Sequence, residues 1–154
     1  MLSLPLLARS YNVEQPTKHF GRALLPAEHM DSLRVLIVDD NQDAADSLAV
    51  LCRLWGHAVS VAYDGPTALT LAEHFEPQVV LLDIRMPGMH GPEVARQLRS
   101  NPKFARATLY ATSANTPNDR WLQEWMRWFD GHLLKPYNLM ELEVLLAQRA
   151  KCQA

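Results

Sequence analysis

Four short, mostly apolar runs in the chain are each closed by a polar side chain. The runs cover residues 35–38, 79–82, 109–112 and 133–134, and after or at their ends stand Asp39, Asp83, Ser113 and Lys135. Apolar stretches of this length, without polar alternation, are typical of strands that are buried on both faces, as in a parallel sheet covered by helices. In such sheets, ligands bind beyond the carboxyl ends of the strands. The runs therefore predict both the fold class and the edge of the sheet at which a site would lie.

Helical periodicity fills the gaps between these runs, so that strand and helix alternate five times from Arg34. We expect helices at about 41–55, 64–75, 91–100, 118–129 and 138–150, and a partly polar edge strand at 58–62. In the first helix, apolar residues at i, i+4, i+7 and i+11 predict one buried stripe, formed by Ala44, Leu48, Leu51 and Trp55. Strands and helices at this spacing form βαβ units, which predicts an α/β fold with a right-handed, doubly wound parallel sheet.

The chain divides into one domain with two flanking segments. Residues 1–32 lack sustained periodicity and carry three prolines, so we interpret them as an N-terminal extension, mostly flexible, with a docking segment at Leu24-Leu25 or no role at all. Met30 would also serve as a domain start. Residues 33–150 form the predicted domain, and 151–154 a short C-terminal tail.

Composition narrows the class of protein. An apolar content of 48% and a charged content of 21% are normal for a soluble globular domain. A net charge of -2 without a basic run argues against direct nucleic-acid binding, and no apolar stretch approaches the roughly 20 residues that span a membrane. The two cysteines show no framework spacing, which indicates reduced thiols and a cytoplasmic protein.

Three carboxylates are predicted to meet at the carboxyl edge of the sheet. Asp39, Asp40 and Asp83 would repel one another unless a cation neutralised them. Carboxylate oxygens and waters suit Mg²⁺, and a backbone carbonyl next to Asp83, that of Arg85, could complete the protein ligands. Taken alone, Asp39-Asp40 could instead cap the first helix; together with Asp83 and Lys135, the pair favours a metal site.

The same edge carries the groups that phosphoryl chemistry needs. Asp83 is followed by Met86-Pro87-Gly88, a turn that would expose it, and an aspartate beside a metal can act as nucleophile towards a phosphoryl group. The charge on the equatorial oxygens then requires donors, which the ammonium of Lys135 and the hydroxyl of Ser113 would supply.

On these residues, the stretch 33–150 resembles the receiver domain of two-component response regulators. Asp39-Asp40 matches the acidic doublet of that family, Asp83 its phosphoacceptor, Ser113 its switch hydroxyl and Lys135-Pro136 its lysine and cis-proline turn. The resemblance implies a flavodoxin-like, five-stranded parallel sheet with strand order 2-1-3-4-5. It also implies Mg²⁺ dependence and phosphorylation of Asp83 by a sensor histidine kinase or a phosphotransfer protein.

Two positions depart from the family pattern. His132 stands where the family usually has a switch Tyr or Phe, and it could still move inward when Ser113 moves, with added sensitivity to pH. Trp128-Phe129 replaces a pair of small residues. The resemblance further implies that Arg85 and Asn115 flank the acyl phosphate and modulate its hydrolysis.

A cluster of tryptophans marks the fourth predicted helix. Trp121, Trp125 and Trp128 stand at i, i+4 and i+7 and so share one face, which either packs on the sheet or anchors a partner. In the family that this chain resembles, the surface of helix four, strand five and helix five is where partners and second copies dock.

The sequence thus predicts a stand-alone receiver that signals through a protein partner, a homodimer or a phosphorelay. It would not be an enzyme beyond its own phosphoryl acceptance and autodephosphorylation. The alternative is a degenerate receiver that acts as an interaction scaffold without phosphorylation. A hydrolase of the haloacid-dehalogenase kind would need an aspartate where Arg85 stands, and a flavin carrier would need a phosphate loop where the acidic doublet lies.

Overall fold

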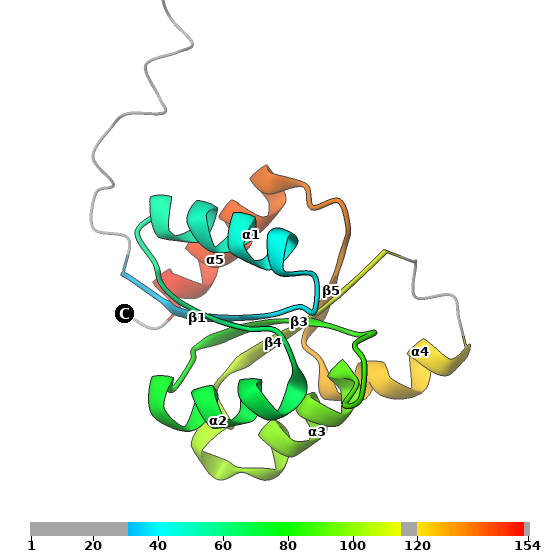
Figure 1. Cartoon of the computed structure of the whole chain (residues 1–154). Coiled ribbons are helices and arrows are strands. Elements are labelled where there is room, and N and C mark those ends of the chain that lie inside the picture. Colours follow the sequence, from blue (N-terminus) through cyan, green and yellow to red (C-terminus); the bar gives the residue numbers. More distant parts are fainter. Residues whose placement is uncertain (1–30, 115–119, 153–154) are drawn as a thin grey trace, which may run out of the picture.

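The computed structural model describes residues 31–114 and 120–152, which fold into a parallel sheet between two layers of helices (Figure 1). The strands are β1 (Arg34–Val38), β2 (Ala58–Ala62), β3 (Val79–Asp83), β4 (Thr108–Ser113) and β5 (Gly131–Leu134). The helices are α1 (Gln42–Leu54), α2 (Gly65–Phe75), α3 (Gly91–Ser100), α4 (Arg120–Trp125) and α5 (Leu139–Lys151), with 3₁₀ turns η1 (Pro102–Phe104) and η2 (Met126–Trp128). None of the helices in these ranges is long and apolar enough to cross a membrane.

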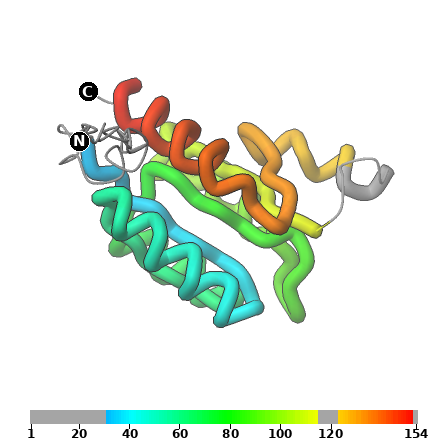
Figure 2. The backbone as a smooth tube through the Cα atoms, turned by 90° about the horizontal axis from the view of Figure 1, so that it is seen from above, coloured from blue at the N-terminus to red at the C-terminus, as the bar shows by residue number. Residues whose placement is uncertain are grey.

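The sheet has the strand order β2-β1-β3-β4-β5, and all four pairings are parallel. This confirms the predicted α/β class, the order 2-1-3-4-5 and the edge position of β2. Helices α1 and α5 cover one face and α2 and α3 the other (Figures 1 and 2). Every β–α connection therefore leaves the sheet at the same edge, the carboxyl-end rim.

Alternation along the strands divides the core into two clusters. On β1, Leu36 and Val38 belong to the cluster beneath α2 and α3, whereas Val35 and Ile37 belong to the cluster beneath α1 and α5. All residues of the central strand β3 are buried, as expected for a strand covered on both sides. Burying one such side chain stabilises the fold by about 1.5–3 kcal/mol, so the strand that ends in Asp83 is firmly held.

Helix α1 begins as predicted, but its buried stripe is displaced. Asn41 caps the helix by accepting a hydrogen bond from the backbone N–H of Ala44 at 3.1 Å, so neither member of the acidic doublet is the cap. The predicted stripe was wrong by about one residue: Leu48 is buried, whereas Ala44, Leu51 and Trp55 are only half-buried. The buried residues are Ala45, Leu48, Ala49 and Cys52. Three of these four side chains are small, and the larger Leu51 and Trp55 are less deeply buried.

The fourth helix is shorter than predicted. The sequence indicated 118–129, whereas α4 ends at Trp125 and continues as the 3₁₀ turn η2, and residues 115–119 lie outside the described ranges. Arg99 explains the end of this segment, because its Nε donates to the carbonyl of Trp128 at 3.1 Å. Phe129 then adopts an extended conformation and enters the core.

One histidine lies in the interior of the fold. His57 is buried, and its Nδ1 accepts a hydrogen bond from the backbone N–H of Leu33 at 3.3 Å. Both cysteines are free, with Cys52 buried and Cys152 exposed.

Candidate functional site

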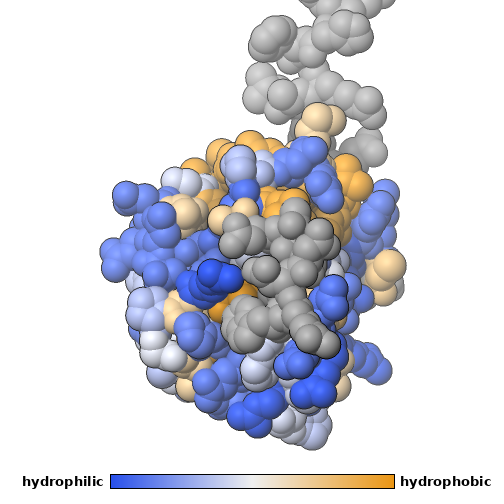
Figure 3. All heavy atoms as spheres, turned by 90° about the vertical axis from the view of Figure 1, so that its right-hand side faces the viewer, coloured by the Kyte–Doolittle hydropathy of each residue, from blue (hydrophilic) through white to orange (hydrophobic). Residues whose placement is uncertain are grey.

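The carboxyl-end rim brings together side chains from two connections and two strand ends. Asp39 directly follows β1, Asp83 ends β3, Ser113 ends β4 and Lys135 follows β5. The register of the sheet aligns these ends, since Asp83 pairs with Thr112 and Ser113 with Leu134. Figure 3 faces this rim, where hydrophilic side chains gather over much of the visible surface. The positions predicted from the sequence therefore share one edge of the fold.

Lys135 connects two of the acids. Its Nζ donates to Asp39 Oδ2 at 2.6 Å and to Asp83 Oδ1 at 2.7 Å. Burial lowers the pKa of Lys135, but the hydrogen bonds to Asp39 and Asp83 outweigh burial, and the net effect raises the pKa above its ordinary value. The ammonium is therefore fixed as a cation between the carboxylates.

The three acids are close enough to share one ion. Asp39, Asp40 and Asp83 each offer a carboxylate oxygen within 4.8 Å of the others; Asp39 and Asp83 are buried and Asp40 is exposed. Burial raises the pKa of Asp83, and the charges of Asp39 and Asp40 add to this rise, whereas Lys135 opposes it. One ammonium among three acids leaves an excess of negative charge. The clustered carboxylate oxygens are the kind of ligand that a hard divalent cation prefers.

The loop after Asp83 is held so that this residue stays at the rim. The backbone N–H of Ile84 donates to Thr112 O, and that of Gly91 donates to Ile84 O, both at 3.1 Å. A Cβ on Gly91 would lie 2.2 Å from the carbonyl oxygen of Asp83, so only glycine lets α3 begin this close to the strand. Arg85 is exposed within this loop, and its role as a carbonyl ligand stays a prediction.

Ser113 and His132 form a pair that the sequence did not predict. Ser113 Oγ and His132 Nε2 are 2.8 Å apart, with Ser113 buried and His132 half-buried. Burial lowers the pKa of His132. The pairing of β4 with β5 is the feature from which this contact could have been predicted. His132 pairs with Ala111, so it lies on the same face as Ser113, two residues further along β4.

The remaining predicted residues are Asn115 and the three tryptophans of the fourth helix. Asn115 lies outside the described residues, as does the side chain of Trp121. Trp125 and Trp128 are half-buried, and Trp128 packs against the core and under the guanidinium of Arg127, 5.0 Å from the ring centroid. The structure therefore leaves both interpretations of the tryptophan face open.

The chain matches known proteins over this domain. The family model described as response regulator receiver domain matches residues 35–147. The chain is 36% identical over 108 residues to the sensory transduction protein RegX3 of Mycolicibacterium smegmatis, covering 70% of this chain and 46% of that protein. It is 32% identical over 124 residues to the DNA-binding response regulator MtrA of Mycobacterium tuberculosis, covering 79% and 53%. The chain thus spans about half the length of these curated relatives.

Solved structures share the fold. The chemotaxis protein CheY4 of Vibrio cholerae has a TM-score of 0.70 at 24% identity, covering 76% of this chain and 98% of that one. The receiver domain of the sensor histidine kinase PA1611 from Pseudomonas aeruginosa, with a magnesium ion coordinated in its active-site cleft, has a TM-score of 0.70 at 24% identity, covering 78% and 98%.

Proposed function

The chain belongs to the response regulator receiver domain family of two-component signalling, and on this premise we propose that Asp83 accepts a phosphoryl group from a sensor histidine kinase or a phosphotransfer protein. The receiver unit would comprise residues 33–150. The observation that carries the proposal is the pair of short contacts from Lys135 to Asp39 and Asp83, at the edge where the acids converge. Receiver domains are signalling switches and not classical enzymes, so the product is the modified chain itself.

Mg²⁺ is the cofactor that this donor set fits. Receiver domains bind Mg²⁺ in an acidic site, and here Asp39, Asp40, Asp83 and the backbone carbonyl of Arg85 would hold it. When bound, the ion supplies positive charge that offsets the three acids and the incoming phosphoryl oxygens. The excess of carboxylates over the single ammonium supports this assignment.

The chain's own residues would then perform the transfer. A carboxylate oxygen of Asp83 attacks the phosphorus, a P–O bond forms, and the P–N bond to the donor imidazole breaks. Lys135 already lies 2.7 Å from Asp83 and stays cationic, so it can neutralise charge on the acyl phosphate. Ser113 would donate its hydroxyl to a phosphoryl oxygen, and Arg85 and Asn115 would modulate hydrolysis.

Output would pass through a protein partner or a homodimer. The proposed surface joins α4, β5 and α5 and includes Trp121, Trp125 and Trp128. Exposed apolar side chains support it: Leu134 on β5, and Leu139, Met140 and Val144 on α5. Two free cysteines support the proposed cytoplasmic location. The expectation of no direct nucleic-acid contact depends on charge alone, and the MtrA relative is named as DNA-binding.

Labelling with acetyl phosphate and Mg²⁺ tests the proposal. The wild-type chain should be phosphorylated, and Asp83→Asn should abolish labelling, because the amide is a far weaker nucleophile. Asp46→Asn is the matched control, since Asp46 is exposed on α1 and bonds Tyr63 instead of the acidic cluster. Equal labelling of Asp83→Asn and wild type would overturn the assignment. Absence of labelling in the wild type would favour the degenerate scaffold.

A further inference from the structure

The contact between Ser113 and His132 places the switch hydroxyl against an imidazole. The two residues lie on neighbouring strands, and Ser113 Oγ is 2.8 Å from His132 Nε2, a good hydrogen-bond distance. Ser113 is only 8% exposed, so water competes little for its hydroxyl. The contact is therefore a specific hydrogen bond of the described structure.

An imidazole can do here what a hydrocarbon ring cannot. A phenyl ring at position 132 would fill a similar space without accepting or donating a hydrogen bond, whereas each nitrogen of an imidazole does one or the other. A serine hydroxyl carries a single proton. With His132 Nε2 as the acceptor, the hydroxyl cannot donate this proton to a phosphoryl group on Asp83 as well, so its bond to His132 has to break when Ser113 turns toward that group.

We propose that His132 is a positioning residue that holds the Ser113 hydroxyl in the unphosphorylated state and thereby opposes the activated arrangement. This inference rests on the proposed phosphorylation of Asp83 and adds a regulatory step to the same site. The energy that the bond contributes before activation is lost when Ser113 leaves the ring. An intramolecular hydrogen bond of ordinary net strength shifts such an equilibrium about 2- to 12-fold.

Binding of beryllofluoride with Mg²⁺, which mimics the aspartyl phosphate, measures this step by calorimetry on the full chain. His132→Phe removes the hydrogen bond and keeps an aromatic ring, so it should bind beryllofluoride about 2- to 12-fold more tightly than wild type. His132→Gln places an amide near the position of Nε2 and should restore affinity toward the wild-type value. His74→Phe is the control, because His74 is exposed on α2 and its Nδ1 contacts the Thr70 carbonyl one turn earlier.

A double-mutant cycle separates the hydrogen bond from a change of shape. In a Ser113→Ala background there is no hydroxyl to hold, so His132→Phe should leave the affinity for beryllofluoride unchanged. The same gain with and without Ser113, equal affinities of the Phe and wild-type chains, or weaker binding of His132→Phe would each overturn the inference. Failure of the wild-type chain to bind beryllofluoride would instead overturn the proposed phosphorylation.

Discussion

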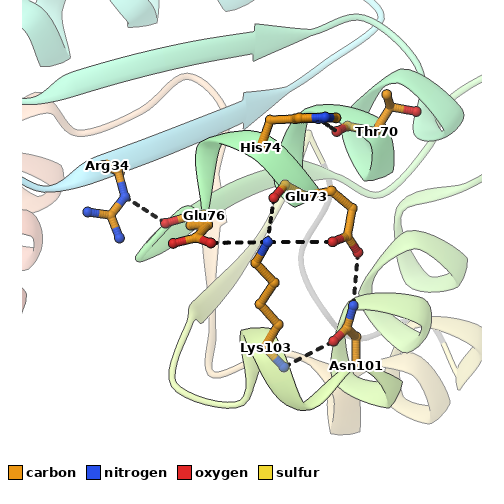
Figure 4. A network of polar contacts seen from close by, with 7 residues as sticks. All are labelled: Arg34, Thr70, Glu73, His74, Glu76, Asn101 and Lys103. Carbon is orange, nitrogen blue, oxygen red and sulfur yellow. Dashed lines mark hydrogen bonds and ion pairs between the residues drawn. The ribbon is translucent and has the colours of Figure 1, made fainter.

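Two lysines of this fold each lie between two acids, at opposite ends of the sheet. At the carboxyl-end rim, Lys135 contacts Asp39 and Asp83 at 2.6 and 2.7 Å, and the acid side chains are only 4% and 9% exposed. At the amino-end rim, Lys103 lies 3.6 Å from Glu73 and 3.1 Å from Glu76, whose side chains are 50% and 58% exposed (Figure 4). The residue types are alike, so burial makes the difference between the two groups.

The amino-end group consists of charges that already have structural partners. Lys103 also donates to the carbonyl of Glu73, and Arg34 donates through Nε to that of Glu76, near the end of α2 (Figure 4). Cations near a helix C-terminus offset its dipole and bind its last carbonyls. At the carboxyl-end rim, by contrast, the three acids exceed the single ammonium. The comparison indicates that the amino-end group holds elements of the fold together. The carboxyl-end group has an excess of negative charge that a further cation would offset.

The largest expected effect comes from removing the buried cation. Lys135→Met leaves Asp39 and Asp83 buried without their partner, and breaking such a pair costs about 3–5 kcal/mol of unfolding free energy. Urea unfolding without Mg²⁺ measures the loss, and added Mg²⁺ should recover part of it. A loss below about 1 kcal/mol, as for an exposed pair, would remove the distinction between the two rims.

Mg²⁺ itself should act at only one rim. A ligand that binds only the folded state stabilises it by about 2.7 kcal/mol at a concentration 100-fold above its dissociation constant. Asp40→Asn should weaken this stabilisation, because Asp40 offers one of the three clustered oxygens. Glu76→Gln should leave it intact. Thermal unfolding over a Mg²⁺ series provides the measurement, and equal losses in both variants would contradict the assignment.

The free energy of unfolding should depend on pH through His57, a buried histidine that lies away from the acidic cluster. Burial lowers the pKa of His57, so the folded chain holds this imidazole neutral while the unfolded chain protonates it first as the pH falls. Its contribution to stability is present above the unfolded pKa of about 6.5 and is lost as the pH falls toward the folded value. His57→Asn can still accept from Leu33 and should unfold with a shallower pH dependence between neutral and mildly acidic pH. An unchanged slope would refute this.

The smallest effect is expected at the exposed lysine. Lys103→Met should change the urea midpoint little, because exposed ion pairs are screened by water and salt. Phosphorylation of Asp83 should be unaffected. A loss comparable to that of Lys135→Met would show that the amino-end group matters more to the fold than its exposure implies.

The fold could be predicted because local signals agreed with one another. Apolar runs and helical periodicity indicated the same alternation, and the structure begins α2 and α3 with a glycine and a proline and caps α5 with Asn138. Polar residues at strand ends placed the acids, Ser113 and Lys135 at one rim, since parallel strands all end there. Their chemical roles stay predictions until they are tested on the protein.

What the sequence could not give depends on contacts between distant segments. His57 is buried and accepts a hydrogen bond from a backbone N–H 24 residues away. The stripe of α1 is set by which small side chains fit against the sheet, which periodicity fixes only to within about one residue. The bond between Ser113 and His132 requires the strand register, which no local pattern encodes. Arg99, from α3, binds the carbonyl of Trp128 at the end of η2, a contact between segments 29 residues apart.

The most direct test of the central claim is to locate the phosphoryl group. After incubation with acetyl phosphate and Mg²⁺, borohydride reduces an aspartyl phosphate to homoserine, which peptide mass spectrometry identifies by position. We expect one converted residue, Asp83, and no conversion when Mg²⁺ is chelated. Conversion at another carboxylate, or equal conversion of Asp83 without the metal, would contradict the account.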